Sequence, residues 1–103
     1  MFGVQNTKVG TERLAYRLVW AYARVEAAVR PIDKKVADAE LLGMTKAANA
    51  VGYGHTENHV SSTVWEIMRE RPQPAWNATD GSARIAWEQE ATAALTAALD
   101  EIL

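Results

Sequence analysis

The placement of three prolines constrains the fold of this chain more than any other feature of its sequence. They stand at positions 31, 72 and 74, so the segments between them can each be helical without interruption. Nineteen of the 103 residues are alanine, the strongest helix former, and only six are glycine. The sequence therefore predicts an all-α fold: one small domain, residues 1–103, built as an antiparallel bundle of three to four helices.

Apolar residues that recur at helical spacing place the expected helices at about 11–30, 33–51, 57–70 and 82–103. Thr11 and Asp33 are the expected N-caps of the first two helices. The apolar positions of the second helix continue past Gly43, which favours one continuous helix over a break with Thr45 as a new N-cap. Residues 1–10 show no periodicity and are expected to form an irregular N-terminal arm.

Residues 71–81 contain prolines, a tryptophan and a glycine, and predict a stiff connector before the last helix. Nine larger apolar residues lie on the apolar stripes of the expected helices and are the predicted core: Leu14, Leu18, Val25, Leu41, Met44, Val64, Ile67, Leu95 and Ile102. Trp65 and Trp87 fall on or beside these stripes, and both are expected to be buried.

Charge is unevenly distributed along the chain. Residues 1–35 carry seven basic and three acidic side chains, whereas residues 36–103 carry four basic and ten acidic ones. This asymmetry indicates either that a basic helix packs beside acidic ones or that a basic face binds a ligand. The absence of cysteine excludes disulfides, cysteine-based zinc sites and a thiol nucleophile.

The sequence carries no recognisable enzyme signature, so we expect neither catalysis nor a cofactor. It has no glycine-rich phosphate loop and no arrangement of serine, histidine and aspartate typical of hydrolases. His55 and His59 could share one face of a helix, but no third ligand stands at a diagnostic spacing, so we predict no metal site. No apolar run approaches the length of a membrane span, and no signal peptide is recognisable, which favours a cytoplasmic protein.

The first expected helix has a second set of side chains opposite its core stripe. Arg13, Arg17, Trp20 and Arg24 step by four, three and four residues, with Tyr16 alongside. Mixtures of arginine and aromatic residues are typical of the centres of protein interfaces. The alternative is that Trp20 packs beneath the connector of its own domain. Trp76, in that connector, could likewise dock into a partner or clamp the connector to the bundle.

These observations predict a non-enzymatic regulatory or adaptor module that binds another protein with an acidic surface. The predicted partner-binding residues are Arg13, Tyr16, Arg17, Trp20, Arg24 and Trp76. A product of a phage or mobile element that targets a host protein would fit this description. We expect a monomer or a weak homodimer, and any dimer should form through a surface other than these arginines.

DNA binding is the alternative function. Residues 48–53 resemble the first half of a helix-turn-helix motif, which would occupy residues 45–70. The second half departs from the pattern in two ways. Its apolar anchor, Val60, stands two residues later than the motif requires, and its helix has no basic residue before Arg69. DNA-binding proteins draw much of their affinity from lysine and arginine contacts with phosphates, so this alternative is the weaker one.

Overall fold

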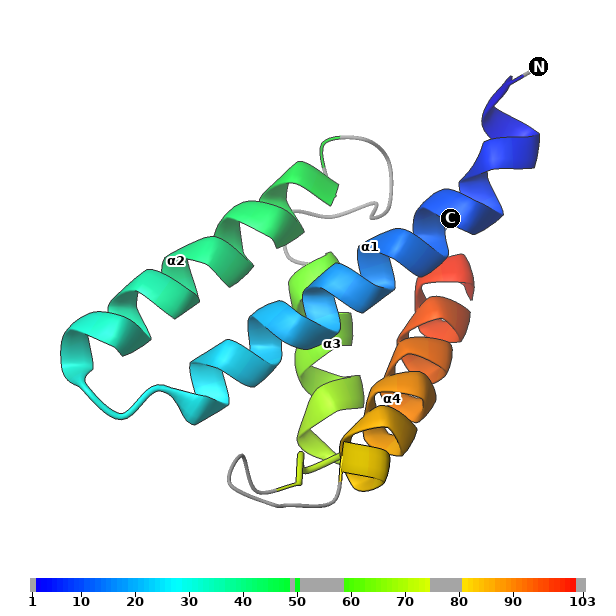
Figure 1. Cartoon of the computed structure of the whole chain (residues 1–103). Helices are drawn as coiled ribbons and strands as arrows, with labels where there is room; N and C mark the ends of the chain where they lie inside the picture. Colours follow the sequence, from blue (N-terminus) through cyan, green and yellow to red (C-terminus); the bar gives the residue numbers. More distant parts are fainter. Residues whose placement is uncertain (1, 49, 51–58, 75–80, 102–103) are drawn as a thin grey trace.

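The structure is a computed structural model that describes residues 2–48, 50, 59–74 and 81–101, with side chains for these residues except 2–9 and 59. Four helices make up its regular structure: α1 (Phe2–Ala27), α2 (Pro31–Ala48), α3 (His59–Arg69) and α4 (Gly81–Glu101). Successive helices reverse direction, and α1 lies between α2 and α4 while also contacting α3 (Figure 1). This arrangement confirms the predicted all-α bundle.

The central position of α1 follows from the distribution of its small and apolar residues. Leu18 and Val25, on the predicted stripe, are buried, and so are Ala15, Val19 and Ala23 beside it. The buried arc of α1 is therefore wider than a single stripe, and its alanines let neighbouring helices approach closely. What remains exposed is the face that carries the arginines.

The start of α1 corrects the sequence prediction. The irregular arm expected for residues 1–10 is wrong over residues 2–10, because α1 begins at Phe2. Thr11 is not an N-cap but a fully buried residue inside the helix. No proline interrupts this segment, and adding a turn to an existing helix is far easier than nucleating a new one. The first turns of α1 extend beyond the end of α4 (Figure 1).

The start of α2 also differs from the prediction. The Lys34 amide donates to the Arg30 carbonyl oxygen at 3.0 Å, so Pro31 is the first helical residue rather than a residue before the helix. Proline suits that position because the amide it lacks would have no partner within the helix. Asp33 is thus not the N-cap. It lies in the first turn, where its carboxylate accepts a 2.7 Å hydrogen bond from Arg30 Nε. A negative charge at this end of the helix also interacts favourably with the positive end of the helix dipole.

The predicted continuity of the second helix is confirmed, since α2 runs through Gly43 to Ala48. Its expected end near residue 51 lies outside the described residues. Residues 72–74 are non-helical, as the connector prediction requires, whereas residues 75–80 are not described. The α4 helix begins at Gly81, inside the range predicted for the connector.

The core largely matches the predicted set. Of the nine predicted residues, five are buried and three are partly buried against the core, while Ile102 lies outside the described residues. Trp87 is buried as expected, but Trp65 is 45% exposed, which corrects its assignment to the core. Trp65 makes an edge-on contact with the ring of Tyr22, with the ring centroids 4.9 Å apart.

The beginning of the connector is tied to both α1 and α4. Trp87 Nε1 donates to the Arg71 carbonyl oxygen at 2.8 Å, which satisfies the polar atom of a buried indole. Gln73 Nε2 donates to the carbonyl oxygen of Ala23 and to the Glu26 carboxylate, each at 3.1 Å. These bonds fix where the chain leaves α3. In the part of the chain that the structure describes, no helix is both long and apolar enough to cross a membrane.

Candidate functional site

The outer side of α1 carries five of the six residues predicted to bind a partner. We call Arg13, Tyr16, Arg17, Trp20 and Arg24 the arginine–tryptophan face. Arg13, Arg17 and Arg24 are exposed and Tyr16 is 48% exposed, whereas Trp20 is partly buried. This face is therefore what α1 presents after the core has formed. The sixth predicted residue, Trp76, lies outside the described residues.

A groove of about 610 Å³ runs between this face and α4. We call it the α1–α4 groove; its lining residues from α1 are Glu12 and Tyr16. Its α4 side includes Thr92, Ala93, Thr96, Ala97 and Asp100. These side chains are mostly small, and they leave space beside the large ring of Tyr16. Tyr16 also lines two adjoining hollows, one with Arg13 and Arg17 and one with Arg17, Trp20 and Arg24.

Trp20 is committed to contacts within the chain. Its Nε1 donates a 2.9 Å hydrogen bond to Glu88 Oε1 on α4. Its ring meets that of Trp87 edge-on, with centroids 6.1 Å apart and planes 80° apart. Of the two interpretations predicted from the sequence, packing of Trp20 within its own domain is thus closer to the structure. The contacts are with α4, however, and not with the connector as that interpretation expected. Trp20 also lines a surface hollow together with Tyr16, Arg17 and Arg24.

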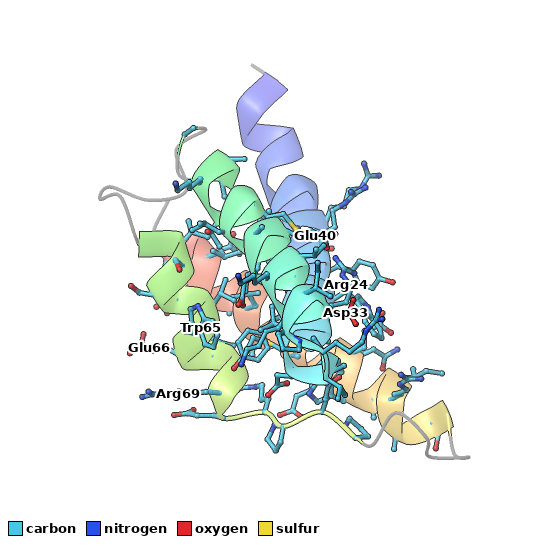
Figure 2. The ribbon with its side chains drawn as sticks, turned by 90° about the vertical axis from the view of Figure 1, so that its left-hand side faces the viewer. Arg24, Asp33, Glu40, Trp65, Glu66 and Arg69 are labelled. Atoms are coloured by element: carbon cyan, nitrogen blue, oxygen red, sulfur yellow. The ribbon has the colours of Figure 1, made fainter. Side chains whose placement is uncertain are left out.

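The arginines of the face differ in their partners. Arg24 Nε lies 3.3 Å from Glu40 Oε2 on α2, and the two side chains are each about half exposed (Figure 2). Within the described part of the chain, Arg13 and Arg17 form no ion pair or hydrogen bond. The basic first helix therefore meets an acidic neighbour at Arg24, and two of its positive charges stay free to meet charges from outside.

The α4 side of the groove holds a buried hydroxyl without a partner. Thr96 Oγ1 donates to the Thr92 carbonyl oxygen at 2.6 Å, but Thr92 Oγ1 itself has no hydrogen-bond partner among the described residues. Sequence periodicity places Thr92 and Thr96 opposite the apolar stripe of α4, and so did not indicate that they border α1. The signal available in the sequence is the run of small side chains at positions 92–94 and 96–98.

No metal site is formed by the described side chains, which contain no group of three histidine, cysteine, aspartate or glutamate residues suited to hold an ion. The side chains of His55 and His59 lie outside the described residues, as does the turn at Gly52 on which the helix-turn-helix alternative depends. In α3, the described side chains include one basic residue, Arg69, in the last turn.

Comparison with known proteins adds no relative: no protein-family model, no curated protein sequence and no solved structure matches this chain. The function must therefore be argued from the groove and the charges around it.

Proposed function

We propose that this domain is a non-enzymatic regulatory or adaptor module that binds an acidic segment of another protein along the α1–α4 groove. The observation that carries the proposal is the exposure of Tyr16 beside the groove, next to Arg13 and Arg17, whose charges have no partner within the described residues. Tyrosine and arginine together are the residue types that most often anchor protein interfaces.

The distribution of charge defines the chemistry of the partner. Arg13 and Arg17 line the hollow that adjoins the groove at Tyr16, whereas the charged residues of the groove itself are acidic: Glu12 on α1, and Glu88 and Asp100 on α4. A matching segment would present carboxylates to Arg13 and Arg17 and an apolar side chain to the space beside Tyr16, and it would keep its acidic groups away from the three carboxylates of the groove. This separation of positive and negative groups would fix the direction in which the segment lies.

The test is selection of binding peptides from a random library displayed on phage, followed by affinity measurements on the enriched sequences. The proposal expects enriched peptides to be acidic with an apolar anchor, and their affinity to fall as salt rises. The variant Arg13→Glu/Arg17→Glu should weaken binding by about 2 kcal/mol or more, and Tyr16→Ala by a similar amount.

The matched control is Lys34→Glu/Arg69→Glu, which changes the net charge equally at exposed sites outside the groove. It should leave peptide affinity within about twofold of the unmodified chain, as expected for charges outside an interface. Equal losses in both double variants would show that only net charge matters, and would refute the assignment of the groove.

A single substitution at Arg69, compared with Arg13→Glu/Arg17→Glu, tests the alternative function. A duplex DNA probe would bind if α3 reads DNA, and Arg69→Glu would then abolish retention while Arg13→Glu/Arg17→Glu would not. That result, together with a failure to select any peptide, would replace the present proposal.

A further inference from the structure

The outward side of α2 is apolar and largely exposed in the described part of the chain, although Val36 also lines a hollow beside Arg24 and Ala27 of α1. Five residues form what we call the outer α2 stripe: Ile32, Val36, Ala39, Gly43 and Ala47. They step by four, three, four and four residues, so they share one face of the helix. All five are exposed, Ile32 by 65% and Val36 by 55%. The buried residues of α2 lie on the opposite side.

Gly43 lies within the outer α2 stripe, and no described neighbour explains the choice of glycine at this position. A Cβ atom added there would meet nothing within 4 Å. A glycine inside a helix lowers stability relative to alanine, and here it relieves no crowding between helices. With Ala39 and Ala47 it makes a shallow surface, which would let a second helix axis come close.

The charges beside the outer α2 stripe are separated by sign. Lys35 and Lys46 border one edge, and Asp33 and Glu40 border the other. Asp33 and Glu40 lie on the side of α2 that faces Arg24 (Figure 2). If two such helices pack in parallel, the basic edge of each runs along the acidic edge of the other. If they pack antiparallel, like charges face each other.

The spacing agrees with the parallel arrangement. When two helices pack in parallel along an apolar stripe, the residue just before a stripe position on one helix lies beside the residue five positions later on the other helix. Lys35 and Glu40 are five residues apart. Each helix would thus supply one lysine and one glutamate to two equivalent ion pairs. Glu40 could accept both bonds, because only its Oε2 contacts Arg24 in the ion pair between them.

We propose that the outer α2 stripe is a self-association surface, through which two copies of this chain pair with their α2 helices parallel. The surface differs from the arginine–tryptophan face, as the repulsion between arginines on that face requires. Ile32 and Val36 are its two large apolar side chains, so the interface is small. We therefore expect a weak dimer in equilibrium with the monomer, as is usual for interfaces below about 1,200 Å².

Sedimentation equilibrium over a wide range of concentrations tests the pairing. The unmodified chain should approach a dimer mass at high concentration, and Val36→Glu should raise the dissociation constant by about tenfold or more, because it buries a charge in the seam. Ile85→Glu on α4 is the matched control, since Ile85 is also 55% exposed. A monomer at all concentrations, or equal effects of the two variants, would overturn the proposal.

Two further variants test the parallel orientation. Because the chain has no cysteine, Ala47→Cys introduces a single thiol near one end of α2. Only a parallel pair brings the two copies of this position together, so mild oxidation should give a cross-linked dimer at low concentration. Ala86→Cys, also exposed, is the control for random collision. Cross-linking no faster than in the control would refute the parallel arrangement.

The ion pairs predict a charge-swap result. Lys35→Glu alone should weaken the dimer, and Lys35→Glu/Glu40→Lys should restore the dissociation constant to within about threefold, because the two edges exchange sign together. Thermal unfolding of each variant, measured at a concentration where it is monomeric, controls for loss of the Arg24–Glu40 pair. A double variant weaker than the single one would contradict the pairing of Lys35 with Glu40.

Discussion

The contact between Trp20 and α4 makes a quantitative prediction that bears on both the fold and the site. Trp20→Phe keeps an aromatic ring against Trp87 but removes the donor that bonds to Glu88. A hydrogen bond to a charged acceptor contributes about 1.5–3 kcal/mol. Because the bond is only partly buried and the smaller ring also covers less area, we expect the variant to lose about 1.5–2 kcal/mol of unfolding free energy.

Urea unfolding followed by far-ultraviolet circular dichroism measures this loss, with an unchanged dependence on urea showing that the unfolding transition is the same. A double-mutant cycle with Glu88→Ala isolates the bond itself, and its coupling energy should be about 1 kcal/mol. The matched control is Trp65→Phe, because Trp65 is also partly exposed and has no indole hydrogen bond within the described residues. This control should lose less than about 1 kcal/mol.

A coupling energy below about 0.3 kcal/mol would refute the reasoning, since that is the range in which independent sites simply add. The result also decides how Trp20 variants are used. If the bond stabilises the fold as expected, then a loss of partner binding in Trp20→Ala reports unfolding as well as contact. The charge variants at Arg13 and Arg17 are then the cleaner probes of the groove.

Three further predictions follow from the core and the groove. Leu18→Ala and Leu95→Ala, both at fully buried positions, should each destabilise the chain by about 2–5 kcal/mol in urea unfolding, and unchanged midpoints would show that the core is wrongly assigned. Thr92→Val should raise the unfolding free energy by about 1 kcal/mol, because it replaces a buried hydroxyl that has no described partner; a loss of stability would mean that the hydroxyl is bonded. Burial, reinforced by the Glu26 carboxylate and opposed by Arg69, raises the pKa of Tyr22 above its ordinary 10.0. The unfolded chain then loses the Tyr22 proton first, so stability should fall as the pH rises above about 10, and Tyr22→Phe should remove that part of the fall in unfolding measured across this range.

The exposed side of α1 could be predicted from sequence because one helix carries all the information needed. The apolar residues of α1 fill one arc, so the arginines at positions 13, 17 and 24 must point away from it. Which helix lies beside that face could not be predicted in the same way. It depends on how α4 packs against α1. From the sequence alone, Thr92 and Thr96 are equally compatible with a solvent-facing position and with a position that lines a groove.

The sequence prediction for α2 was correct for its buried face but incomplete for its exposed face. This helix has apolar residues on two faces, and periodicity alone does not say which face a bundle will bury. The stripe with Leu41 was correctly assigned to the core, whereas Ile32 and Val36 were not recognised as a second stripe. In the structure α1 covers one side of α2, and the exposure of Ile32 and Val36 shows that the bundle leaves the other side open.

The two proposed surfaces are compatible because they lie on different sides of α1. The α2 helix is on one side and α4, with the groove, is on the other (Figure 1). A dimer formed through α2 would therefore leave both copies of the α1–α4 groove accessible.

A partner with two acidic segments could bind both grooves of such a dimer, and the second contact would form at the high effective concentration set by the first. Val36→Glu should then weaken binding of a peptide with two tandem segments toward the affinity of a single segment, while leaving single-segment affinity unchanged. Surface plasmon resonance with immobilised domain cannot separate these effects, so the comparison should be made in solution, by fluorescence anisotropy of the labelled peptides. Equal affinities of the unmodified chain for one and two segments would show that the two grooves do not act together.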